Sequence, residues 1–132
     1  MAPRRGCVFV PFLVRRSGGG CVKRLPAAFY KTPSGRVPVR ERLKIHGDEG
    51  YKIIGEDIKY IEFGWPVGMP VCRALGDGLW DVRSDIVQGR ISRVLFCIHA
   101  GRMALLHGFI RKTQKTPQSD LHLALKRKKE IT

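Results

Sequence analysis

The stretch of sequence that decides the fold runs from Gly78 to Pro117. It reads GLWDVR at 78–83, GRISRVLFCI at 89–98 and GRMALLHGFIRKTQKTP at 101–117. These three runs are apolar, contain many β-forming residues and follow one another at the distance expected of β-hairpins, with glycines between them. They predict consecutive antiparallel strands, that is, a meander.

The remaining segments complete an α+β pattern. We expect a first strand within 22–31 that begins after Pro26 or lies at a sheet edge, a turn at 32–36, and a short strand at 71–75. Helices are predicted at 37–46 and from Asp48 to about residue 63, the second from the helical spacing of Tyr51, Ile54, Ile58 and Ile61. A last helix is expected after Thr116 as its cap and Pro117 in its first turn.

Cations and an imidazole interrupt the predicted strands. Burying such groups in a sheet is costly unless an anion meets them, so their clustering predicts a phosphate-binding site. The residues concerned are Arg83, Arg90, Arg93, His107, Arg111, Lys112 and Lys115.

Composition limits the class of protein. The chain has 132 residues, enough for one domain, and a formal net charge of +14. A domain this basic is typical of nucleic-acid binding, although a basic surface also serves solubility or an acidic protein partner. The four cysteines show neither metal-ligand spacing nor a disulfide framework, so we expect no metal, no cofactor and a reducing, cytoplasmic compartment.

The first twenty residues differ from the rest. Residues 1–20 contain four arginines, no acidic residue and a run of three glycines, which predicts a flexible or loosely docked extension before a domain at 21–132. Their apolar centre, CVFVPFLV at 7–14, is too short to span a membrane. Alternatively it adds a strand, which Pro11 would confine to a sheet edge.

Several blocks of the chain resemble the phage-derived, HigB-like branch of the RelE/ParE toxin superfamily. The similarity extends from residue 28 to about residue 130. The blocks are FYKT at 29–32, Arg40-Glu41, GEDIK at 55–59, EFGWP at 62–66, RAL at 73–75, GLWDVR at 78–83, RISRVLF at 90–96, LLHGFI at 105–110 and KTQKTP at 112–117. Two positions depart from the pattern: Arg42 stands where such sequences often have Trp, and Arg111-Lys112 replaces the more usual Lys-Lys.

The resemblance implies a fold and an activity. The fold would be RelE-like: an N-terminal strand, a helical hairpin, an antiparallel sheet and a C-terminal helix. The activity would be metal-independent cleavage of mRNA, often on the ribosome, and the partner a cognate antitoxin with a helix-turn-helix domain. An acidic patch on the helical hairpin (Asp48, Glu49, Glu56 and Asp57) is either solvated or part of the antitoxin-binding surface.

Metal-free RNA cleavage needs a base for the 2′-hydroxyl, an acid for the leaving oxygen and cations around the phosphorane. The chain shows no carboxylate pair, no Ser-His-Asp order and no Gly-rich phosphate loop, so cationic groups have to supply this chemistry. Our catalytic candidates are His107, Arg93, Arg83, Lys112 and Lys115. Our RNA-binding candidates are Arg73, Arg90, Arg111, Lys126, Arg127 and Lys128.

Each candidate also has a plainer interpretation. His107 lies between Leu105 and Phe109 on one face of the last strand, where it is either a satisfied core residue or the general acid or base. Arg83 either contacts phosphate or pairs with Asp81 or Asp85, and Lys112 and Lys115 are either proton donors or a solvated loop.

Three functions therefore stay open. The first is an mRNA endoribonuclease toxin. The second is a non-catalytic module that binds RNA or the ribosome, and the third is a gyrase-inhibiting toxin of the ParE type. Fold analogy does not separate the first from the third.

Overall fold

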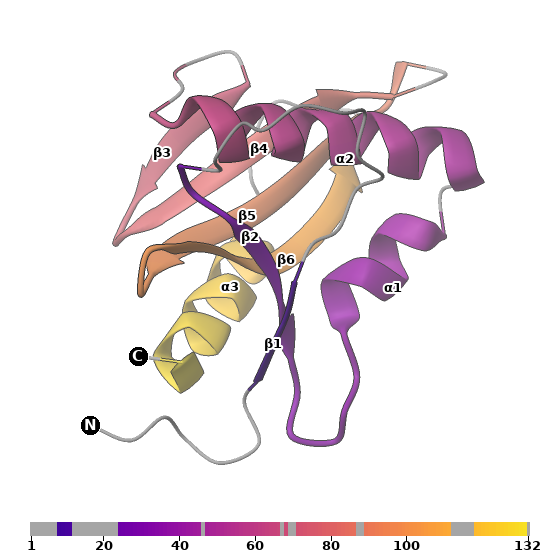
Figure 1. Cartoon of the computed structure of the whole chain (residues 1–132). Coiled ribbons are helices and arrows are strands. Elements are labelled where there is room, and N and C mark those ends of the chain that lie inside the picture. Colours follow the sequence, from indigo (N-terminus) through magenta and orange to yellow (C-terminus); the bar gives the residue numbers. More distant parts are fainter. Residues whose placement is uncertain are drawn as a thin grey trace.

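The computed structural model describes residues 8–11, 24–45, 47–66, 68, 71–86, 89–111 and 118–131 (Figure 1). The elements, in chain order, are β1 (Val8–Pro11), β2 (Ala27–Lys31), α1 (Pro38–Lys44), α2 (Gly47–Gly64), β3 (Cys72–Gly76), β4 (Leu79–Asp85), β5 (Ile91–His99), β6 (Arg102–Arg111) and α3 (Gln118–Ile131). The predicted α+β class and the order of its elements are confirmed, and β2 begins directly after Pro26.

The strands form one six-stranded sheet in the order β1-β2-β6-β5-β4-β3. Strands β3 to β6 are neighbours in sequence and antiparallel in space, which confirms the meander. The pairing between β2 and β6 is different, because these two strands are parallel, with Ala27–Phe29 against Met103–Leu105. The paired part of β2 thus stops beside Leu105, two residues before His107.

Strand β1 takes up part of the segment that we expected to be an extension. Val8–Pro11 pairs antiparallel with β2 and lies at the edge of the sheet, as the alternative interpretation required for a strand that contains Pro11. The rest of residues 1–20 lies outside the described residues. The division of the chain at residue 20 therefore stays a prediction.

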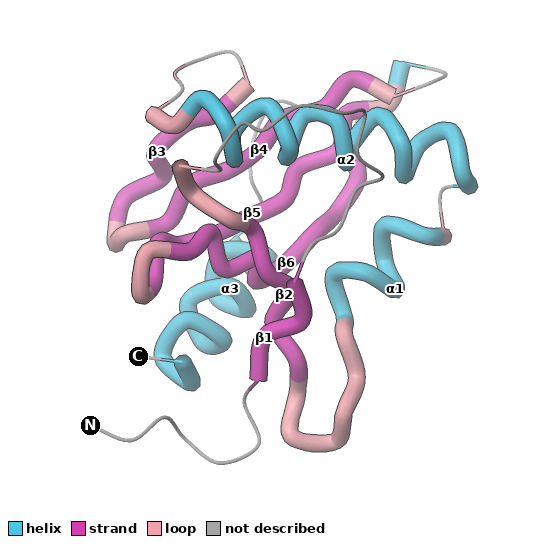
Figure 2. The backbone as a smooth tube through the Cα atoms, in the orientation of Figure 1, coloured by secondary structure: helices cyan, strands magenta, loops and turns pink. Residues whose placement is uncertain are grey.

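Helices cover both faces of the sheet. Figure 2 shows α2 across one face and α3 on the other, and two separate clusters of buried side chains correspond to these two layers. On the α2 face, Ile54, Ile58 and Ile61 are completely buried against Val94 and Phe96. Burial of each such side chain contributes about 1.5–3 kcal/mol, so the predicted helical stripe is the main anchor of α2.

A buried carboxylate joins α2 to the start of β2. Oε2 of Glu62 accepts a hydrogen bond of 2.7 Å from the backbone N–H of Ala27, and the backbone oxygen of Glu62 accepts from the N–H groups of Arg24 and Leu25. Because Glu62 is 1% exposed, these bonds form away from solvent, where they hold β2 in place beside β6.

Candidate functional site

A β-bulge in β6 sets the direction of His107. The register of β5 against β6 shifts between the pairs Phe96–Leu105 and Leu95–His107, so Leu106 is an extra residue in β6. Leu105 faces the α2 layer, whereas Leu106 packs in the α3 layer and His107 contacts α3 itself. Our expectation that His107 and Leu105 share a face is wrong, because the extra residue reverses the alternation.

His107 is paired with a carboxylate on α3. Its Nε2 lies 2.6 Å from Oδ1 of Asp120, a residue in the first turn of the helix. Both residues are 8% exposed, and the imidazole also stacks on the ring of Phe109 at 5.7 Å. Asp120 was not among the predicted site residues, because it is 13 residues from His107 and meets it only when α3 packs on the sheet.

The surroundings of His107 have opposing effects on its pKa. Burial lowers this pKa below its ordinary value, whereas the hydrogen bond and the negative charge of Asp120 raise it. The positive charges of Arg127 and Arg42 lower it further, and the net direction is downward. The imidazole is therefore neutral at neutral pH and able to accept a proton.

His107 lies in the wall of a cavity of about 480 Å³, which we call the His107 cleft. The cleft lies between α1 and α3, beside the part of β6 that extends past the paired part of β2. Its lining consists of Arg36, Pro38, Glu41, Arg42, Ile45, His107, Gly108, Ser119, Asp120, Leu123 and Arg127.

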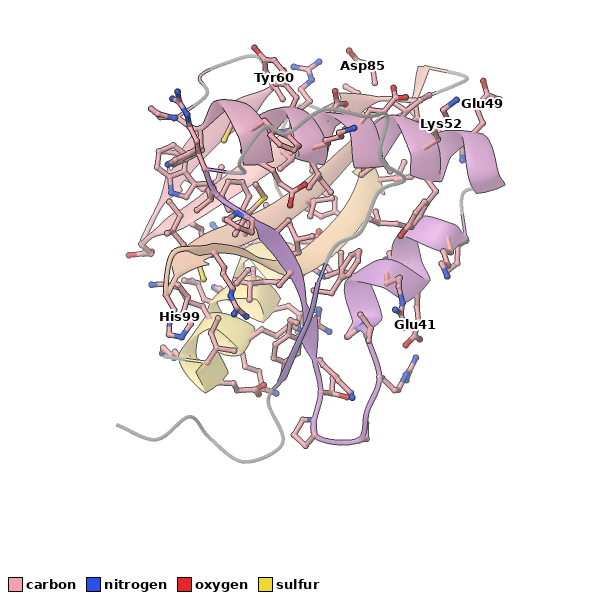
Figure 3. All side chains as sticks on the ribbon, viewed as in Figure 1. Glu41, Glu49, Lys52, Tyr60, Asp85 and His99 are labelled. Atoms are coloured by element: carbon pink, nitrogen blue, oxygen red, sulfur yellow. The ribbon has the colours of Figure 1, made fainter. Side chains whose placement is uncertain are left out.

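Three arginines place positive charge around the cleft. Arg36 donates from Nη2 to Oε1 of Glu41 at 2.8 Å on the exposed side of α1, where Glu41 is labelled in Figure 3. This contact is the first cause of a raised pKa at Arg36 and a lowered pKa at Glu41. Arg42 is exposed on the same helix, so the cleft has a basic rim around a neutral imidazole.

Arg127 is the third arginine and also a structural anchor. Its Nη1 donates to the backbone oxygen of Leu106, the bulge residue, at 2.7 Å, and its guanidinium lies 5.6 Å from the ring centre of Tyr30. The Tyr30 hydroxyl in turn donates to Glu130. Burial lowers the pKa of Arg127, and the contacts of its side chain fix α3 against β6. Its assignment to RNA binding stays a prediction.

Arg93 does not have the position that we expected. It is 2% exposed, and its Nη1 donates to Oδ2 of Asp81 at 2.9 Å, with the Asp81 side chain equally buried. The anion that offsets the burial of this guanidinium is therefore part of the protein. A direct contact between Arg93 and a substrate phosphate is not supported by this geometry.

Arg73 and Arg83 lie on the same sheet face as Arg93 but outside the His107 cleft. Across the strands, Arg73 pairs with Asp81 and Arg83 with Arg93. Arg73 Nη2 lies 3.8 Å from Asp81 Oδ2, and Arg83 Nε lies 3.9 Å from Asp85 Oδ1. Three strand spacings of about 4.8 Å separate Arg73 from His107, so one small ligand cannot touch both.

The other candidates are dispersed or outside the described residues. Lys128 donates from Nζ to the backbone oxygen of Asp77 at 2.8 Å, Lys126 is exposed on α3, and Arg90 is half-buried just before β5. Lys112, Lys115 and the side chain of Arg111 lie outside the described residues. Of the predicted site residues, His107 and Arg127 line the cleft, together with Asp120, Arg36 and Arg42.

Within the described ranges, no group of three or more His, Cys, Asp or Glu side chains is arranged to hold a metal ion. In the same part of the chain, no helix has the length and apolar character needed to cross a membrane.

Comparison with protein families gives one match, which covers most of the sheet, α2 and α3. The model of the family "Phage derived protein Gp49-like (DUF891)" matches residues 44–129. The chain belongs to this family. Gp49-like proteins fall within the broad RelE-like toxin group, and the family is associated with toxins of toxin-antitoxin systems. No curated protein matches the chain.

The match divides the cleft of this Gp49-like protein into two parts. His107, Asp120 and Arg127 lie within the matched residues, whereas Arg36, Glu41 and Arg42 precede them. The imidazole-carboxylate pair therefore belongs to the family region, and the basic rim on α1 lies before it.

Proposed function

We propose that this protein is the toxin of a type II toxin-antitoxin system, of the HigB-like branch, and that it cleaves mRNA on the ribosome in the cytoplasm without a metal ion. The observation that carries the proposal is a buried imidazole, paired with a carboxylate, in the wall of a cleft with a basic rim. Membership of the Gp49-like family supports the toxin class.

His107 would act as the general base. RNA supplies its own nucleophile, the 2′-hydroxyl, so the protein has only to remove its proton and orient the phosphate. A base with a pKa below its ordinary value is unprotonated at neutral pH, which is the form that this step requires.

The arginines of the cleft would bind the phosphate and stabilise the charge of the phosphorane. A guanidinium presents two parallel N–H donors to phosphate oxygens, and Arg42 on the exposed side of α1 is the best placed for a substrate that approaches from solvent. Lys112 or Lys115 remains our candidate for the acid that protonates the leaving 5′-oxygen.

The antitoxin would bind elsewhere on the molecule. The outer side of α2 carries Glu49 and Glu56, and Figure 3 shows the labelled Glu49, Lys52 and Tyr60 along it. These acidic residues contrast with a chain of net charge +14, so the outer side of α2 is our candidate surface for a helix-turn-helix antitoxin that is itself basic.

The test is a cleavage assay that identifies the new RNA ends. Purified protein is incubated with free mRNA in EDTA, and with translating ribosomes in magnesium buffer. Attack by the 2′-hydroxyl leaves a 2′,3′-cyclic phosphate and a 5′-hydroxyl end, which distinguishes it from metal-dependent hydrolysis. His122→Ala, which changes an exposed histidine of α3, is the control for His107→Ala.

The other functions predict different results. A binding module would inhibit translation equally well with His107→Ala and would leave mRNA intact. A gyrase inhibitor would induce DNA damage with mRNA intact. Absence of cleavage both with and without ribosomes would overturn the nuclease proposal.

A further inference from the structure

The contact between His107 and Asp120 determines which ring nitrogen can react. Because Nε2 lies 2.6 Å from Oδ1 of Asp120, Nδ1 is the nitrogen that remains for a substrate. We propose that Asp120 is a positioning residue of the nuclease: it holds His107 in the tautomer protonated at Nε2, so that Nδ1 accepts the 2′-hydroxyl proton. This inference rests on the proposed function and assigns a role to a residue that the sequence analysis missed.

The tautomer follows from hydrogen-bond chemistry. An ionised carboxylate accepts hydrogen bonds and donates none, so a neutral imidazole bonded to it must carry its proton on the bonded nitrogen. The other nitrogen then has a free electron pair. The same logic operates in serine proteases, where a buried aspartate selects the histidine tautomer. Here the carboxylate is bonded to Nε2 and the base is Nδ1.

Three further contacts hold the ring and the helix that carries its carboxylate. Phe109 stacks on the imidazole at an interplanar angle of 27°. Arg127 ties α3, which carries Asp120, to the backbone of Leu106 next to His107, and Lys128 ties the same helix to Asp77. The ring and its carboxylate are thus held by the same two elements, β6 and α3.

The charges that face His107 come from α1 and α3. Arg42, Arg36 and Glu41 belong to the α1 side of the cleft, and Asp120 and Arg127 to the α3 side. Among the described residues, Asp120 is the acidic group bonded to the ring, while both arginines that influence its pKa disfavour a second proton. The carboxylate therefore stabilises the imidazolium that forms when Nδ1 takes up its proton.

The step balances without a cofactor. The 2′-oxygen forms a bond to phosphorus as its proton passes to Nδ1, the bond between phosphorus and the 5′-oxygen breaks, and the 5′-oxygen takes a proton from an acid or from water. The products are a 2′,3′-cyclic phosphate and a 5′-hydroxyl.

Nitrogen NMR of the imidazole tests the tautomer directly. In ¹⁵N-labelled wild-type protein at neutral pH we expect the proton on Nε2. In Asp120→Asn the amide group is able to donate to Nε2, so we expect a shift toward the form protonated at Nδ1 and a lower pKa of His107. A wild-type ring protonated at Nδ1, or an unchanged ring in Asp120→Asn, would overturn the inference.

Kinetics provide the second test. Asp120→Asn should lower kcat about 100-fold or more with little change in KM, by analogy with the loss of the orienting aspartate in a serine protease. The acid limb of the pH profile should move to lower pH, and Asp120→Glu should restore part of kcat. Glu56→Gln is the matched control, because it removes one negative charge from the exposed side of α2, outside the cleft. Denaturation curves for each variant establish that it is folded at the assay temperature.

The two proposals fail in different ways. If the wild-type protein cleaves no RNA, the proposed function fails, and the NMR experiment still decides the role of Asp120 toward the ring. If the protein cleaves RNA but Asp120→Asn retains the wild-type kcat and pH profile, the positioning role fails and the nuclease stands.

Discussion

The pairs Arg93–Asp81 and His107–Asp120 are alike in composition and different in setting. Each joins a basic group of the meander to a carboxylate, and all four side chains are largely buried. Arg93 is 2% exposed and its partner comes from the neighbouring strand of the same sheet, whereas His107 lines a cavity of about 480 Å³ and its partner comes from a helix. A basic residue in a buried strand therefore indicates an anion nearby, but not whether that anion belongs to the protein or to a ligand.

The largest expected difference between the pairs concerns catalysis. Replacement of His107 by Ala should lower the cleavage rate about 10²- to 10⁴-fold, the usual contribution of a general base. His122→Ala should leave the rate unchanged. The rates are measured as the appearance of 5′-hydroxyl ends. A wild-type rate in His107→Ala would show that the pair His107–Asp120, like Arg93–Asp81, is structural and not catalytic.

The Arg93 pair should instead determine stability. Arg93→Ala leaves Asp81 buried without this partner and should lower the free energy of unfolding by about 3–5 kcal/mol, measured by urea denaturation. The double variant Arg93→Met with Asp81→Leu should recover most of this loss, because it removes both charges. If the double variant has as low a free energy of unfolding as Arg93→Ala, then Arg93 and Asp81 stabilise the fold by more than neutralising each other's charge.

The pH dependence of stability should identify the histidine pair. The folded pKa of His107 is lower than its unfolded value of about 6.5, so the unfolded chain binds the proton more tightly. The contribution of His107 to stability is complete above that value and is lost as the pH falls through the folded pKa. Wild-type protein should therefore lose more stability between pH 7.5 and pH 5 than His107→Gln does, with His122→Gln as the control. Equal losses in wild type and His107→Gln would contradict the lowered pKa.

The smallest expected effect is on the salt dependence of RNA binding. Arg42→Ala in the His107→Ala background should reduce the slope of log K against log salt by about 0.7, the value for one lost contact to a single-strand phosphate. The double variant Arg93→Met with Asp81→Leu, which removes two buried charges, should leave the slope unchanged. Binding is measured by fluorescence anisotropy with a labelled single-stranded RNA, and equal slopes for His107→Ala and for the double variant His107→Ala with Arg42→Ala would remove Arg42 from the RNA contact.

Much of the fold was predictable because its signals are local. The period of Ile54, Ile58 and Ile61, the glycines between the last strands and the position of Pro26 each act over a few residues, and the structure agrees with each. The parallel pairing of β2 with β6 was not predicted, because it joins residues some seventy-five positions apart and leaves no periodic trace.

The candidate site was predictable in part, for the same reason. His107 was found from its unusual position in an apolar strand. Asp81 was considered as a partner of Arg83, but the register places Arg83 directly opposite Arg93, so that Asp81 is diagonal to Arg93 and reaches its guanidinium. The contact between His107 and Asp120 depends on how α3 packs on β6, which no local pattern reports.

Leu106 gives the protein a sensitivity to length that substitution experiments do not reveal. Loss of this one residue would restore regular pairing and leave His107 opposite Leu95 on the α3 face, but it would remove the backbone oxygen that Arg127 binds and a buried side chain of the α3 layer. A single-codon deletion at this position would thus loosen α3, which carries Asp120, from the strand that carries His107.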